Sequence, residues 1–253
     1  RLEGLGVKFV CNTFIGQDKS LDDLFAEGFD TIFIGTGTHI PQEVRMENDQ
    51  IKGVFQAMYL LTNVQLVENG ELEESFIPVK KGDRVVIIGG GNVAMDCCRS
   101  LKRILPDVKL MYRRSQEEMP ASKGEVKDAI KEGVDFHYLE NIAEIVRDEA
   151  GDVIGVQADT MVLGEKDGSG RASVHVQEGS KHFIPANLVV AAVGQKVDFS
   201  ILDQELKILS KSEHKTSLEG VFVCGDALYG PARIGNAMKD GKACSEEVFE
   251  YLK

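Results

Sequence analysis

The residues best suited to chemistry lie in one short stretch, VVIIGGGNVAMD at residues 85–96, where an apolar run meets three glycines. In such a turn Gly89 permits a tight bend, Gly91 lets the backbone approach a pyrophosphate, and Ala94 lets a helix pack on a strand. Amide groups at the start of that helix then attract the anion, aided by the helix dipole. The predicted binding residues here are Gly89, Gly90, Gly91, Asn92, Val93 and Ala94.

A glycine fingerprint alone is weak, because a glycine-rich turn can also bind nothing. Here the surroundings favour a dinucleotide site, since an apolar strand precedes the turn, a helix over 92–104 follows it, and a second strand covers 108–112. The sequence therefore predicts that the turn holds the pyrophosphate of a dinucleotide.

The end of the second strand predicts which dinucleotide binds. NAD-binding folds carry Asp or Glu about 20 residues after the glycines, where it accepts from the ribose 2′-hydroxyl. This chain has MYRRS there, and Arg113 and Arg114 would pair with a 2′-phosphate that a carboxylate would repel. Two arginines on a loop often only solvate a surface, but at this position we expect NADPH to be preferred over NADH.

A second set of candidates lies in GVFVCGDALYGPARIGNAMKDGKA, residues 220–243, where an apolar strand ends at Gly225 and Asp226. An Asp at such a strand end accepts hydrogen bonds from ligand hydroxyls, and the helix from Ala232 can stabilise an anionic edge of a ligand. The residues alone leave another interpretation open, a plain strand–turn–helix in which Asp226 is a turn residue.

Strands and helices alternate around the glycine turn, which predicts a parallel sheet with right-handed crossovers. The expected elements are strands over 84–88, 108–112 and 134–139 and helices over 92–104 and 122–132. Antiparallel strands at 142–148, 153–163 and 173–184 and an apolar strand at 187–194 complete this unit. Around it we expect strands at 7–10, 31–37 and 220–226, and helices at 21–25 (capped by Ser20), 53–67 and 232–252.

The composition excludes several classes of protein. The chain has 253 residues and a formal net charge of −12, which argues against binding nucleic acid or an anionic membrane through a basic surface. No apolar run approaches the roughly 20 residues that span a bilayer, and no signal peptide opens the chain. The five cysteines include no CxxC pair and the five histidines are isolated, which argues against a metal site and favours a reducing cytoplasm.

The motifs FIGTGT, VVIIGGGNVAMD, YRRSQEEMPAS, AAVGQ and VFVCGDALYGPARIGNAMKDGKAC together closely resemble the NADPH-dependent glutamate synthase small-subunit (beta) family. Its members are thioredoxin-reductase-like flavoproteins with two dinucleotide sites, and the resemblance spans nearly the whole chain. It implies an α/β fold in which a Rossmann-like NADPH domain, a parallel sheet plus an antiparallel meander, is inserted into an FAD domain. The implied ranges are 78–187 for the NADPH-binding domain and 1–77 with 188–253 for a partial FAD-binding domain.

The resemblance also implies roles for residues outside the glycine turn. One group would lie at the two crossings between the domains, another would hold the ribityl and phosphate part of FAD, and a third would meet the flavin ring from a helix start. These are, in that order, Thr36, Gly37 and Gly194; Gly225 and Asp226; and Ala232, Arg233 and Ile234.

The chain departs from the family by an absence. The family's FAD domain begins with its own GxGxxG and an acidic residue, and nothing here supplies them. After Gly35-x-Gly37, Ile40 stands where a small residue is needed. Pro41 then prevents a helix from continuing, the family's cysteine-rich iron–sulfur part has no counterpart, and the chain begins at Arg1. We therefore expect the C-terminal portion of a longer protein, with a complete NADPH domain and an incomplete FAD site.

The resemblance implies an oxidoreductase that passes a hydride from NADPH to FAD and then releases single electrons to an iron–sulfur domain or a large subunit. Because cofactors do this chemistry, we expect binding residues and no catalytic acid or base. The alternative is a module that binds NADPH or docks other subunits without activity. A short-chain dehydrogenase is disfavoured because no Tyr-x-x-x-Lys occurs, and the adjacent Cys97 and Cys98 suit core packing better than disulfide chemistry.

Overall fold

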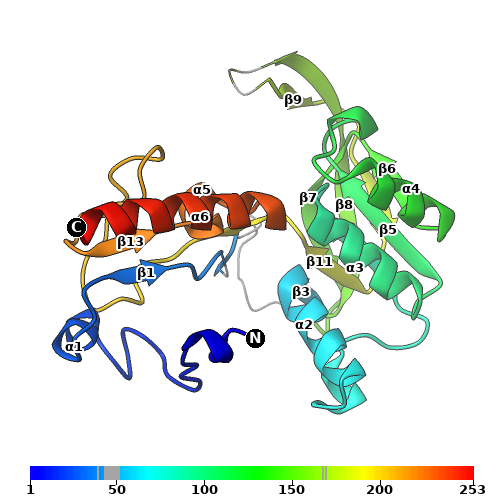
Figure 1. The fold of residues 1–253 in the computed structure, drawn as a ribbon. Helices are drawn as coiled ribbons and strands as arrows, with labels where there is room; N and C mark the ends of the chain where they lie inside the picture. Colours follow the sequence, from blue (N-terminus) through cyan, green and yellow to red (C-terminus); the bar gives the residue numbers. More distant parts are fainter. Residues whose placement is uncertain (39, 43–51, 167, 169) are drawn as a thin grey trace. The chain divides into compact units, whose positions relative to one another are not determined.

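The chain folds into two compact units, seen in a computed structural model that describes residues 1–38, 40–42, 52–166, 168 and 170–253. One unit consists of Arg1–Ile40 and Gln195–Lys253, and the other is the continuous stretch Pro41–Gly194. The second unit is therefore inserted between two parts of the first (Figure 1).

A five-stranded, all-parallel sheet forms the centre of the inserted unit. In spatial order its strands are β3 (Val54–Gln56), β11 (Leu188–Ala191), β4 (Arg84–Ile88), β5 (Asp107–Tyr112) and β6 (Asp135–Tyr138). From β4 the chain runs outward to β5 and β6 on one side, and it returns to β11 on the other. Open parallel sheets bind ligands at such a reversal of strand order, beyond the carboxyl ends of the strands.

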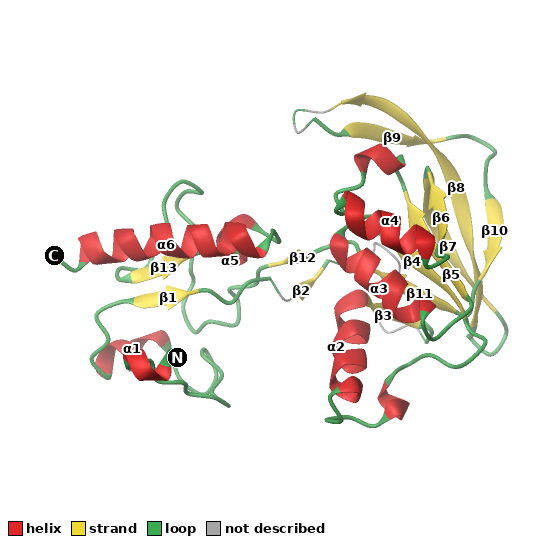
Figure 2. Cartoon of the chain, turned by 45° about the vertical axis from the view of Figure 1, so that its right-hand side comes forward, coloured by secondary structure: helices red, strands yellow, loops and turns green. Residues whose placement is uncertain are grey.

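Alternate residues of the central strand face two different layers, which explains its continuous apolar run. Val85 and Ile87 pack against three helices, and Val86 and Ile88 pack against antiparallel strands on the opposite face. Figure 2 shows the helices on one side of the sheet. They are α2 (Ala57–Glu68), α3 (Asn92–Lys102) and α4 (Lys123–Lys131).

The antiparallel meander forms as predicted. Its strands are β7 (Glu140–Arg147), β8 (Val153–Lys166), β9 (Ala172–Val176) and β10 (His182–Pro185). Of these, β7, β8 and β10 pack on the other face of the sheet. The single strand expected at 173–184 is wrong, because a turn closed by the hydrogen bond from Ser180 N to the Gln177 carbonyl (3.2 Å) divides it into β9 and β10. Both pieces pair with the long strand β8.

The helix predicted at 53–67 begins later than expected. Val54–Gln56 forms β3 instead, because these residues pair in parallel with β11, and α2 starts at Ala57. This pairing is also why β3, α2 and β11 belong to the inserted unit. Single-turn 3-10 helices in the described chain are η1 (Glu3–Leu5), η2 (Glu74–Phe76) and η3 (Gln116–Glu118).

The other unit is built around a parallel pair of short strands, β1 (Ile32–Ile34) and β13 (Val221–Val223). The remaining helices are α1 (Leu21–Ala26), α5 (Asp226–Tyr229) and α6 (Ile234–Tyr251). Ser20 caps α1 as predicted, in a reciprocal capping box with Asp23. The strand expected at 7–10 does not form, and Val7, Phe9 and Val10 are exposed. Among the described residues no helix is long and apolar enough to cross a membrane.

The chain passes between the units next to two short paired strands, β2 (Ile40–Pro41) and β12 (Gln195–Lys196). The observed division at 40/41 and 194/195 differs from the predicted ranges 1–77, 78–187 and 188–253. The prediction placed β3, α2 and β11 outside the inserted unit, whereas the backbone pairing of β11 with both β3 and β4 holds them inside it.

Core burial in β5 gives a direct test of this packing. Leu110 is fully buried in the core between the sheet and the helices, so Leu110→Ala should lower the free energy of unfolding by about 2–5 kcal/mol. The matched control is Leu163→Ala in β8, where the side chain is 37% exposed, and it should cost about 1 kcal/mol or less. Urea unfolding followed by circular dichroism measures both, and equal losses would contradict the burial.

Candidate functional site

The glycine turn lies at the carboxyl end of β4, between the ends of its two neighbours. Gly89 N–H donates to the carbonyl of Met111 in β5 (3.1 Å), and Ala192 N–H, just beyond β11, donates to the Ile88 carbonyl (2.8 Å). Backbone hydrogen bonds therefore hold the turn on both sides, at the reversal of strand order.

Close packing explains why glycines occupy the first two positions of the turn. Gly89 has a φ of +144°, and a Cβ there would lie 2.3 Å from the carbonyl oxygen of Ala192. A Cβ at Gly90 would lie 2.4 Å from the ring of Tyr112. A Cβ at Gly91 would meet nothing within 4 Å. The first two glycines therefore shape the turn, and the third leaves open space.

Helix α3 begins directly after the turn. Its N-cap is Gly91, which has no side chain to accept from the first amides of the helix. These amides also lack an acceptor within the helix, which suits them to an anionic ligand. Ala94 is fully buried, as expected for a residue at which helix packs on sheet, and Val93 is half-buried.

The loop after β5 is built onto the glycine turn. The side-chain oxygen of Asn92 accepts from Ser122 N–H (2.9 Å), and the Gly90 carbonyl accepts from Ala121 N–H (3.0 Å). Tyr112, whose ring limits Gly90, donates its hydroxyl to the Glu118 carbonyl (2.9 Å). The Asn92 side chain is thus used within the protein, while its amide remains at the start of α3.

The structure separates the two arginines that follow β5. Arg113 is exposed, whereas Arg114 has only 9% of its surface in solvent. The Nε of Arg114 donates to the carbonyl of Ala172 at the start of β9 (2.8 Å). Its own carbonyl accepts from Leu139 N–H (3.1 Å). Arg114 therefore ties the end of β5 to the meander, and Arg113 presents its charge to solvent.

The second group of predicted residues surrounds the end of β13. Gly225 has φ +64° and ψ −141°, and α5 begins at Asp226. Gly225 N–H donates to Oδ2 of Asp240 in α6 (2.6 Å). The segment that leads into α6 is exposed at Ala232, Arg233 and Ile234, with 81% of the Ile234 surface in solvent.

The three remaining predicted residues lie beside the crossings of the chain. Thr36 and Gly37 follow β1, and Gly37 has φ +72°. Gly194 follows β11 with φ +107°, and its carbonyl accepts from Gln42 N–H (2.9 Å). Apart from these three, the predicted residues form two groups. One surrounds the glycine turn of the inserted unit, and the other surrounds the end of β13 in the other unit.

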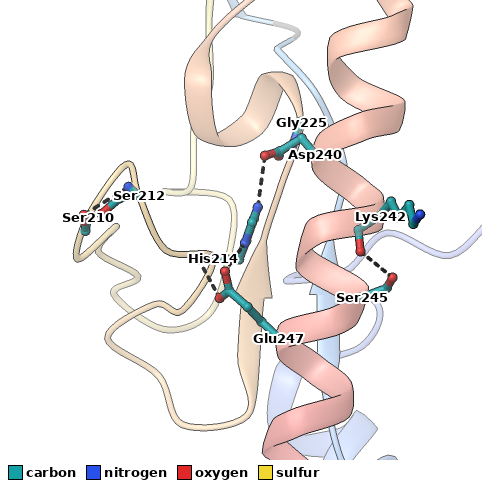
Figure 3. A network of polar contacts seen from close by, with 8 residues as sticks. All are labelled: Ser210, Ser212, His214, Gly225, Asp240, Lys242, Ser245 and Glu247. Atoms are coloured by element: carbon teal, nitrogen blue, oxygen red, sulfur yellow. Dashed lines mark hydrogen bonds and ion pairs between the residues drawn. The ribbon is translucent and has the colours of Figure 1, made fainter.

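A polar cluster next to Gly225 was not predicted from the sequence (Figure 3). The imidazole of His214 lies between two carboxylates of α6, with Nε2 3.0 Å from Oδ1 of Asp240 and Nδ1 2.7 Å from Oε1 of Glu247. These partners are 26 and 33 positions away in sequence, so no local motif marks them. The one available signal is the two-turn spacing of Asp240 and Glu247, which places both on one helix face.

The adjacent cysteines of α3 are buried and unpaired, which confirms the prediction of core packing. Burial and the charge of Asp96 raise the pKa of the Cys97 thiol to about 12, and burial raises that of Cys98 well above its ordinary value. Both thiols are therefore protonated and inert near neutral pH. Among the residues that the structure describes, no cluster of at least three His, Cys, Asp or Glu side chains is arranged to hold a metal ion.

Residues 2–241 match the family described as pyridine nucleotide-disulphide oxidoreductase. The chain is 36% identical, over 100% of its length, to the NADP(+)-dependent formate dehydrogenase subunit beta of Moorella thermoacetica. It is 33% identical, over 99% of its length, to the glutamate synthase (NADPH) small chain of Escherichia coli (strain K12). The predicted resemblance to glutamate synthase small subunits is confirmed, and the chain covers 36% and 56% of these two relatives.

Solved structures share the fold. FprA of Mycobacterium tuberculosis in complex with NADPH matches with a TM-score of 0.74 at 18% identity, over 94% of this chain and 67% of that one. T. acidophilum thioredoxin reductase matches with a TM-score of 0.61 at 22% identity, over 88% of this chain and 66% of that one. These likenesses confirm the predicted α/β class, with a parallel sheet and antiparallel strands.

The first and third glycines of the turn should respond differently to the same substitution. Gly89→Ala should lower the free energy of unfolding by about 2 kcal/mol or more, because a positive φ and a 2.3 Å approach to Ala192 leave no room for Cβ. Gly91→Ala should cost only about 1 kcal/mol or less, because its Cβ meets nothing within 4 Å and only the weaker N-cap preference of alanine is felt. Thermal and urea unfolding compare the two variants, and a large loss for Gly91→Ala would contradict the open space at that position.

Proposed function

The chain belongs to the pyridine nucleotide-disulphide oxidoreductase family, and from this we propose that it is the NADPH-binding part of a flavoprotein oxidoreductase of the glutamate synthase small-subunit type. One observation carries the proposal. An open glycine turn, with uncapped helix amides behind it and the exposed Arg113 at the end of the neighbouring strand, lies at the carboxyl edge of a parallel sheet.

The residues around the turn fit an NADPH molecule. The space at Gly91 and the first amides of α3 suit a pyrophosphate, which needs close backbone and unpaired N–H donors. Arg113 would pair with the 2′-phosphate, and Arg114 would support it by fixing the end of β5. Although the chain is strongly acidic overall, the exposed Arg113 would supply a local positive charge that attracts an anion.

The residues around the end of β13 fit part of an FAD molecule. Gly225 and Asp226 would face the ribityl and phosphate part, and the exposed start of α6 at Ala232, Arg233 and Ile234 would lie against the flavin ring. An exposed isoleucine next to uncapped helix amides suits a flat ring with one polar edge. Nothing in the sequence supplies the glycine fingerprint for the adenosine end.

When both are bound, the nicotinamide and the flavin supply the chemistry of hydride transfer. The protein's own residues then need only bind, orient and shield the two cofactors. Disulfide chemistry at Cys97 and Cys98 is disfavoured by their burial and raised pKa. We assign no catalytic acid or base to this chain.

The proposed enzyme works with a partner in the cytoplasm. Two relatives are named as a subunit beta and a small chain, which supports a role as one component of a larger oxidoreductase. We propose that single electrons leave through an iron–sulfur domain or a large subunit. The chain spans about a third to three fifths of the length of its curated relatives, so the complete reaction belongs to the longer assembly.

The 2′-phosphate assignment predicts a difference between the two nicotinamide cofactors. Arg113→Ala should weaken NADPH binding by about ten- to a hundred-fold, because a hydrogen bond between charged groups is lost, and should leave NADH binding nearly unchanged. The matched control is Arg103→Ala, which removes an exposed arginine at the other end of α3. Isothermal titration calorimetry measures both affinities, and equal affinity of the parent for NADPH and NADH would overturn the assignment.

The flavin assignment predicts a colour. Purified chain mixed with FAD and passed through a desalting column should remain yellow, and anaerobic NADPH should bleach its absorbance near 450 nm. The control is NADH, which should bleach it much more slowly. A colourless chain that still binds NADPH would contradict the enzyme function for this chain and favour a nucleotide-binding or docking module.

A further inference from the structure

The cluster around His214 joins three separate segments at one buried point. The side chain is 5% exposed and lies in the loop before β13. Its ring faces Asp240 and Glu247, and its backbone N–H donates to the second oxygen of Glu247 (3.1 Å). Its carbonyl accepts from Val223 N–H in β13 (2.8 Å). The ring of His214 is therefore held by α6, and its backbone is held by both α6 and β13.

The geometry favours one protonation state of the His214 ring. Each ring nitrogen faces a carboxylate oxygen, and a carboxylate can only accept. A doubly protonated imidazolium donates to both Asp240 and Glu247. A neutral ring donates to one and turns a lone pair toward the other, so one contact becomes repulsive. Figure 3 shows the ring between the two carboxylates, an arrangement in which only the charged ring donates at both contacts.

Asp240 connects this histidine to the proposed flavin site. Its Oδ1 faces His214, and its Oδ2 accepts from Gly225 N–H at 2.6 Å. Gly225 has a positive φ, and a glycine backbone has many accessible conformations, so an external contact can select one of them. The carboxylate of Asp240 supplies that contact, and His214 holds the carboxylate.

The ionisable groups around the ring favour its protonated form. Burial opposes protonation, but the hydrogen bonds and charges of Asp240 and Glu247 outweigh it and raise the pKa of His214 above 6.5. Burial would raise the pKa of Asp240, but the Gly225 amide and His214 outweigh it and lower that pKa. Tyr229, Cys224 and Cys244 also face the cluster, and their pKa values are raised, so they stay neutral near pH 7. The loop itself adds Glu213 and Lys215 beside the histidine.

We propose that His214 is a positioning residue of the flavin site, which holds Asp240 so that Asp240 fixes the Gly225 amide, and that loss of its proton loosens this turn and weakens flavin binding. The inference rests on the proposed FAD site at Gly225 and Asp226. The protonation state of His214 sets the direction in which pH changes the stability of the cluster. Since the folded-state pKa of His214 is raised, the cluster is intact at low pH, its stabilisation is complete below about 6.5, and it is lost as pH rises through the raised value.

The test follows the Gly225 amide and flavin affinity separately across pH 6 to 10. Amide hydrogen exchange by NMR, corrected for intrinsic rates, should show protection of Gly225 falling about ten-fold as His214 titrates, the equivalent of one hydrogen bond. The dissociation constant of FAD, from quenching of its fluorescence, should rise by about the same factor over the same range. His175→Gln, which removes an exposed imidazole in the inserted unit, should change neither profile.

Two variants sharpen the test. His214→Gln donates to only one carboxylate, so it should show low Gly225 protection and weak FAD binding at every pH. Asp240→Asn keeps an oxygen for Gly225 and lets its amide nitrogen donate to a neutral His214, which still donates to Glu247. At low and at high pH alike, this variant should therefore bind FAD as tightly as the parent chain does at low pH. This result stands even if His214→Gln does not fold.

The outcomes separate the inference from the proposed function. Failure of the parent chain to bind FAD at any pH overturns the proposed flavin site, while Gly225 exchange still reports whether His214 controls the turn. FAD binding that does not change as His214 titrates overturns the inference and leaves the flavin site standing. An Asp240→Asn variant that loses affinity at high pH as the parent does also overturns it.

Discussion

The structure depends on one close contact, between the backbone of Gly89 and the carbonyl of Ala192. No side chain fits at Gly89, because its Cβ would lie 2.3 Å from that oxygen. The contact lets β4 and β11 run side by side to their carboxyl ends, and β11 pairs on its other side with the edge strand β3. It also places the glycine turn, the start of α3 and the last residues of the inserted unit at the same edge. Close packing at Gly89 and open space at Gly91 therefore occur within one turn.

The net charge of this chain does not describe the local contacts of its basic side chains. The chain carries −12 overall, yet each unit has a buried basic side chain, Arg114 or His214, with defined hydrogen-bond partners. Arg114 donates to a backbone carbonyl and joins β5 to the meander, whereas Arg113 is exposed. His214 lies between two carboxylates, and one of them, Asp240, accepts from Gly225 N–H just before α5. In both cases an interior contact determines where a neighbouring group points, which is how supporting residues set the geometry of a site.

The sequence was most informative where local signals agree. The run from β4 to β6 followed from apolar periodicity and turn residues, and β4 matches its predicted bounds at Arg84 and Ile88. Strand β3 was missed because Val54–Gln56 precedes a helix without a break, and only pairing with β11 makes it a strand. Val7, Phe9 and Val10 have a strand-like pattern but no strand partner among the described residues. The His214 cluster joins residues far apart in sequence, and composition and spacing carry no signal for such contacts.

The hydrogen bond from Gln42 N–H to the Gly194 carbonyl, 2.9 Å long, has a consequence for how such a chain can be rearranged. It joins the two ends of the inserted unit, so the whole of Pro41–Gly194 enters and leaves the host at a single point. Inserting a segment whose ends are adjacent costs the host very little loop-closure entropy, because the host must span only a very short gap. Recombination could therefore lift this segment out, or exchange it for another nucleotide-binding cassette, and leave the pairing of β1 with β13 intact.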